Sequence, residues 1–166
     1  MTIGAVFERV DRLAGGRQAG YTVPVSTDRR VRRAFVVIVW LLVAGFLLGV
    51  ASVVVAAVLT LQGQDVGIPV WGRCLVVLGI TATLFYFAWR ARLGRYWAYR
   101  RMQLFSRIFP IVALVLAAIP GLYPVWIVTE QIVFAMLLIG VSDYLQTDYM
   151  RAAFPKPEKD SGASGR

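Results

Sequence analysis

Four long apolar runs divide the chain and predict four membrane-spanning helices. They cover residues 34–61, 70–89, 104–119 and 126–145. A helix needs about 20 apolar residues to cross the hydrocarbon core of a bilayer. The third run is short and contains Pro110, so we expect a helix that is kinked or that begins at the proline. A re-entrant hairpin made by the last two runs is the alternative.

The two ends of the chain have a different pattern. Apolar residues recur at helical spacing over residues 2–14, with charged residues on the other face. This predicts an amphipathic helix that lies on the membrane surface or docks on a partner, with Phe7 and Val10 in its apolar face. We expect residues 1–33 to form this cytoplasmic helix and a basic linker. Residues 146–166 should form a mostly disordered cytoplasmic tail, because Pro, Ser, Gly and charged residues dominate its second half.

Positive charge predicts the orientation of these spans. Arginine and lysine residues crowd the segments before the first run, between the second and third runs, and after the fourth, whereas the other two connections carry only Arg73 at an edge. Short basic loops stay in the cytoplasm, because positive charge resists translocation. The predicted fold class is therefore an all-α integral membrane protein with four transmembrane helices and both termini inside. We expect it in the bacterial cytoplasmic membrane.

Composition narrows the possible functions. The chain has 166 residues, 58% of them hydrophobic, which leaves room for one membrane domain over residues 34–145 and for no separate soluble core. The topology accounts for the net charge of +9, so we expect no nucleic-acid partner. Cys74 is the single cysteine and there is no histidine, which leaves no nucleophile–base or metal-binding constellation. We therefore expect a non-enzymatic protein without a cofactor or metal.

Glu130 is the most informative charged residue, because it lies inside the fourth run, where an ionised carboxylate is costly. Arg73 lies at the matching depth of the second run, so the two residues should form an intramembrane charge pair. The alternative is that Glu130 couples a proton or cation to transport, as a membrane glutamate does in small drug/proton antiporters. Their glutamate lies in the first helix, and residues 34–61 contain no acid.

Two further residue patterns suggest contact surfaces. A juxtamembrane segment mixes arginine with an aromatic residue and should contact anionic lipid headgroups or an acidic partner; it contains Arg90, Arg92, Arg95, Trp97, Arg100 and Arg101. Small residues recur at a spacing of four as Gly45 and Gly49 in the first run and as Ala113 and Ala117 in the third. Small residues let helix backbones approach closely, either within the bundle or in a homo-oligomer.

In hydropathy and composition over the whole chain, the protein resembles small four-helix actinobacterial proteins that act as accessory subunits of envelope transport machines, such as Mce-type lipid importers. The resemblance rests on no motif. It implies an accessory or scaffolding subunit of a larger inner-membrane complex, with a large membrane protein and membrane lipids as partners. A small transporter that works as a homodimer through Glu130 is the competing hypothesis.

Overall fold

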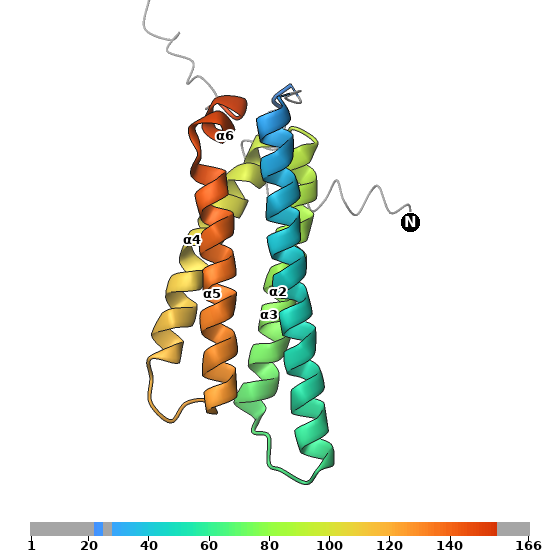
Figure 1. The fold of residues 1–166 in the computed structure, drawn as a ribbon, viewed down its shortest axis with the longest axis vertical. Helices are drawn as coiled ribbons and strands as arrows, with labels where there is room; N and C mark the ends of the chain where they lie inside the picture. The colour runs from blue at the N-terminus through green and yellow to red at the C-terminus, as the bar shows by residue number, and fades with distance from the viewer. Residues whose placement is uncertain (1–21, 25–27, 156–166) are drawn as a thin grey trace, which may run out of the picture.

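The computed structural model describes residues 22–24 and 28–155, and this part is helical apart from turns and one isolated backbone bridge. Its helices are α2 (Arg29–Leu61), α3 (Ile68–Arg92), α4 (Tyr96–Ala117), α5 (Val125–Gln146) and α6 (Asp148–Ala153). The four long helices run along a common axis and the short α6 lies at one end (Figure 1). The amphipathic helix predicted over residues 2–14, with Phe7 and Val10, lies outside the described residues.

Local sequence signals explain where these helices begin and end. Asp28 precedes α2, and its side chain accepts a hydrogen bond from the backbone N–H of Arg30 at 2.9 Å, as an N-cap does. Proline stands in the first turn of α3, and Pro124 immediately precedes α5. The first turn of a helix tolerates proline, because the N–H groups there have no partner within the helix.

The four long helices form an antiparallel bundle. Helix α2 packs against α3 and α5, and α4 packs against the same two helices, so that α3 and α5 lie diagonally across the bundle. The start of α2, the end of α3, the start of α4 and the whole of α6 lie at one end, at the top of Figure 1. We call this the arginine-rich end. The turns that span residues 62–67 and 118–124 lie at the opposite, loop end.

In the described part of the chain, α2, α3 and α5 are long and apolar enough to cross a membrane. The chain thus has the pattern of a multi-pass membrane protein. Helix α4 is not among these candidates, because it contains Arg100, Arg101 and Arg107. The fourth crossing and the side of the membrane on which the termini lie therefore stay predictions.

Helix α4 begins earlier than the apolar run at 104–119 predicted. It has 22 residues, which gives a length of about 33 Å at about 1.5 Å per residue. Pro110 lies inside this continuous helix, so the helix does not begin at the proline. A proline removes only its own N–H from the helix ladder, and packing against α3 and α5 holds the helix on both sides of it.

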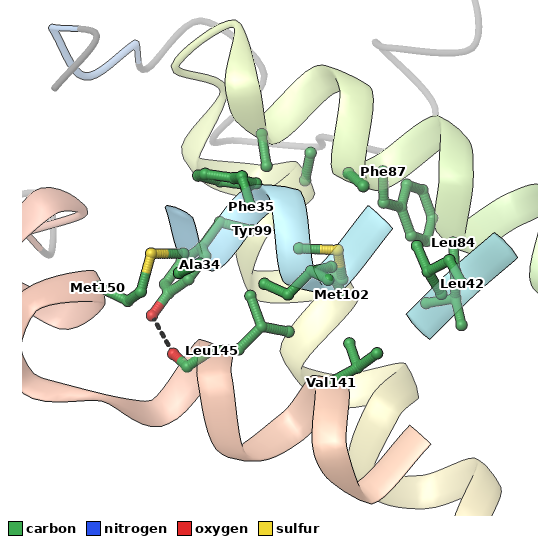
Figure 2. Close-up of a cluster of buried hydrophobic side chains, with 14 of the residues drawn as sticks. Ala34, Phe35, Leu42, Leu84, Phe87, Tyr99, Met102, Val141, Leu145 and Met150 are labelled. Atoms are coloured by element: carbon green, nitrogen blue, oxygen red, sulfur yellow. Dashed lines mark hydrogen bonds between the residues drawn. The ribbon is translucent and has the colours of Figure 1, made fainter. Parts of the chain in front are cut away.

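Most of the buried apolar side chains form one cluster, which extends from the arginine-rich end through the middle of the bundle. Figure 2 shows Phe35 of α2, Tyr99 and Met102 of α4, Leu145 of α5 and Met150 of α6 meeting there. A smaller cluster at the loop end contains Ala56, Val70, Cys74 and Ile127. The interior is therefore mainly apolar toward the arginine-rich end and surrounds the polar site described below toward the loop end.

Helix α6 extends the packed domain beyond the last apolar run. Met150 is fully buried, and the ring of Phe154 stacks on Tyr99 with a centroid separation of 4.4 Å. Phe154 also meets the ring of Phe35 edge to face at 6.3 Å. In the described chain the domain boundary therefore lies near residue 154 rather than at residue 145. Hydropathy missed this segment because a six-residue helix buries too few apolar residues to resemble a span.

Candidate functional site

Arg73 and Glu130 form an ion pair inside the bundle. Each lies in the second turn of its helix, and because α3 and α5 both start at the loop end, the two residues lie at the same depth. Both side chains are 7% exposed. Since the two helices lie diagonally across the bundle, the pair passes through its interior rather than over its surface.

Gln131 joins this ion pair to a third helix. Its side-chain oxygen accepts a hydrogen bond from Arg73 Nε at 3.3 Å, and its side-chain Nε2 donates to the backbone carbonyl of Ala113 at 2.7 Å. Gln131 is itself only 3% exposed. The polar network thus links α3, α4 and α5, and a side chain that the sequence did not single out provides the connection.

Apolar and aromatic residues surround the network. The guanidinium carbon of Arg73 lies 5.9 Å from the centroid of the Tyr123 ring, within the range of a cation–π contact. Cys74 is buried beside Arg73 in the smaller apolar cluster. In such surroundings, removing one member of a buried ion pair leaves an uncompensated charge, which typically costs about 3–5 kcal/mol.

The network leaves some hydrogen-bonding capacity unused. Beyond their ion pair, the terminal guanidinium nitrogens of Arg73 and the carboxylate oxygens of Glu130 have no hydrogen-bond partner among the described residues. Arg73 has five N–H donors, so one bond to Gln131 and one contact with Glu130 do not satisfy it. The described residues therefore leave guanidinium N–H donors and carboxylate oxygens at this site without a hydrogen-bond partner.

The juxtamembrane arginines lie at the arginine-rich end, but they differ in exposure. Arg92, Arg100 and Arg101 are exposed, whereas Arg90 and Arg95 are half-buried. Arg90 donates from Nε to the hydroxyl of Tyr86 at 3.3 Å, and its guanidinium lies over the Tyr86 and Trp89 rings. The exposed arginines can therefore reach headgroups or an acidic partner.

Trp97 does not lie on the predicted lipid or partner surface. It is 2% exposed, and its ring meets Phe87 edge to face with a centroid separation of 5.9 Å. The tight turn between α3 and α4 folds the first turn of α4 back onto the end of α3, which places this ring in the interior. An aromatic residue among arginines predicted an interfacial position here, and the prediction was wrong for Trp97.

Two polar side chains of α4 donate hydrogen bonds to a backbone carbonyl in the last turn of α5. The hydroxyl of Tyr99 donates to the backbone carbonyl of Leu145 at 2.7 Å (Figure 2). Gln103 Nε2 donates to the same oxygen at 3.0 Å. Carbonyls in the last turn of a helix lack partners within the helix. Tyr99 precedes the predicted span at 104–119, and burial raises its pKa to about 12, so the hydroxyl remains a donor well into the alkaline range.

The small residues of α2 serve contacts within the bundle. Gly45 and Gly49 are buried. A Cβ at Gly45 would lie 3.4 Å from the Phe134 ring of α5, and one at Gly49 would lie 3.1 Å from the Leu78 side chain of α3. Ala113 and Ala117 of α4 are half-buried, and the carbonyl of Ala113 belongs to the network described above. Side chains of the same chain therefore fill the space beside the two glycines.

Comparison with known proteins gives no match: no family model, curated protein sequence or solved structure is significantly similar to this chain. The resemblance to accessory subunits of envelope transport machines therefore stays a prediction.

Proposed function

We propose that the chain is a non-enzymatic accessory or scaffolding subunit of a larger complex in the bacterial cytoplasmic membrane. The observation that carries this proposal is the ion pair of Arg73 and Glu130, which Gln131 ties to α4. The two intramembrane charges neutralise each other and hold three helices together. They are therefore better suited to maintaining a rigid shape than to moving a charge across the membrane.

The exposed surface of the bundle agrees with the role of an accessory subunit. Exposed arginines gather at one end, where they would contact anionic headgroups or an acidic partner. In the proposed topology α4 is the fourth crossing, and both termini lie in the cytoplasm with the arginine-rich end. Attachment to an envelope lipid-transport system is our more specific proposal, and it rests on the resemblance in hydropathy and composition alone.

A small homodimeric transporter that uses Glu130 is the second candidate. The unused hydrogen-bonding capacity of Glu130 and Arg73 favours it, because a coupling carboxylate must exchange its partner during a cycle. Packing within the chain disfavours a homodimer made through Gly45 and Gly49, because side chains of α5 and α3 already fill the space beside these two glycines.

Purification from native membranes distinguishes the two candidates. The full chain, expressed at its natural level, is extracted in mild detergent, and the mass of the particle and its components are measured. We expect a stoichiometric complex with a larger membrane protein. A particle that contains only two copies of this chain would contradict the accessory role and favour the transporter.

A further inference from the structure

The outward face of α5 carries one stripe of residues along its whole length. The members recur at alternating spacings of four and three, and all are exposed; they are Val125, Thr129, Ile132, Met136, Ile139 and Asp143. This is the seven-residue repeat with which one helix packs against another in a coiled coil. The stripe is apolar except for Thr129 and for the acid near the arginine-rich end, so a second helix could lie along it.

Asp143 is the unusual member of this stripe. It is exposed, and no ion pair involves it among the described residues. The nearby Arg107 instead donates a hydrogen bond to the side chain of Gln146. Of the acids in the described helices that can cross a membrane, Glu130 faces the interior and is neutralised, whereas Asp143 points away from the bundle without a cation.

A lipid environment does not readily explain this carboxylate. Anionic headgroups, which the exposed arginines would attract to this end of the bundle, repel it. Acids within spans usually pair with a cation or another polar group. In a helix pair, a single polar position within an otherwise apolar repeat selects the register and the partner. The charge therefore indicates a partner with a cation at this depth.

We infer that the stripe on α5 is the docking surface for a transmembrane helix of a different protein, with Lys or Arg opposite Asp143. This inference rests on the proposed accessory function and specifies its partner. The apolar members would supply the packing, and Asp143 would set the register by its charge. A second copy of this chain is the less suitable occupant, because two copies that pack symmetrically through this stripe would bring their two Asp143 carboxylates together.

Site-specific photo-cross-linking tests the surface. The photoreactive residue replaces Met136 on the stripe or, as a control, Leu75 on the exposed face of α3; these side chains are similarly exposed, at 66% and 64%. The full chain is cross-linked in native membranes, and the attached peptide is sequenced. We expect position 136 to capture a transmembrane segment of another protein with Lys or Arg at one end, and position 75 to capture mainly lipid.

Charge reversal tests the role of Asp143. Asp143→Arg should lower the cross-linking yield at position 136 about tenfold, as expected from losing one polar contact between membrane helices. An acid at the partner's cationic position should restore the yield. The control is Asp148→Arg, which changes an exposed acid of α6 outside the stripe.

The outcomes separate this inference from the proposed function. If a partner copurifies but position 136 captures only lipid or a second copy, the docking surface is wrong and the accessory function stands. The docking surface is equally wrong if Asp143→Arg leaves the yield unchanged. If no other membrane protein copurifies under any condition, the accessory function and the docking surface both fall.

Discussion

At the scale of single residues, the ion pair between Arg73 and Glu130 could be anticipated and its connection to α4 could not. Both charges interrupt apolar runs at matching depth, and isolated intramembrane charges are too costly to remain unpaired. Gln131 gave no comparable signal. An amide is less costly in a span than a charge, and its acceptor on α4 is a backbone carbonyl, which no sequence pattern marks.

The pair makes a prediction about stability. Glu130→Gln should lower the free energy of unfolding by about 3 kcal/mol, because the Arg73 guanidinium then lies buried without a counter-charge. The double change Arg73→Met with Glu130→Leu should recover most of that loss, since no orphan charge remains. Thermal unfolding of the purified protein in detergent measures both effects.

The matched control for this pair is Asp65→Asn, which removes an exposed acid from the connection between α2 and α3 at the same end of the bundle. It should leave the unfolding temperature nearly unchanged. A Glu130→Gln protein that is as stable as the parent, yet inactive in its pathway, would contradict the structural role and favour the transporter.

At the scale of elements, the turn between α3 and α4 depends on a contact with the segment before α2. The backbone N–H of Val23 donates to the carbonyl of Gly94 at 2.8 Å, and Val23 is buried. Gly94 has a φ of 78°, and a Cβ there would lie 2.3 Å from the carbonyl oxygen of Val23. The position therefore excludes every side chain for two reasons.

Gly94→Ala should consequently destabilise the protein more than Gly63→Ala does. Gly63 has nearly the same φ, 79°, but no neighbour within 4 Å of an added Cβ, so its substitution should cost only the conformational term of about 1–2 kcal/mol. The extra loss at Gly94 reports the contact with Val23. Thermal unfolding of the two variants and proteolysis near residue 23 measure it, and equal losses would show that the contact contributes nothing.

Other features of the elements show which kinds of structure hydropathy can predict. The long apolar helices were found because their apolar runs extend over many turns. The start of α4 at Tyr96 and the whole of α6 were not, because their burial depends on contacts between helices, as with Trp97 on Phe87 and Phe154 on Tyr99. The pattern GxxxG predicted a close helix contact, and only the packing of α2 showed that the contact lies within the bundle.

At the scale of the whole molecule, the order of the helices along the chain followed from the sequence. Which helices pack against each other did not. The placement of α2 between α3 and α5 depends on long-range fits, such as Gly140 of α5 against Leu41 of α2. The orientation in the membrane rests on charge, since the exposed arginines gather at one end of the bundle. Whether α4 crosses the bilayer determines on which side the turn at 118–124 lies.

Cysteine accessibility tests this topology directly. Cys74 is buried and is first replaced by alanine, after which single cysteines are placed at Gln64, Leu122, Arg92 or Arg151, all of them exposed. With both termini inside and four crossings, a membrane-impermeant thiol reagent added to whole cells should label the first two positions and spare the last two. If whole cells are labelled at Gln64 while Leu122 reacts only after detergent has dissolved the membrane, α4 and α5 form a re-entrant hairpin, because the turn at 118–124 would not reach the outer surface.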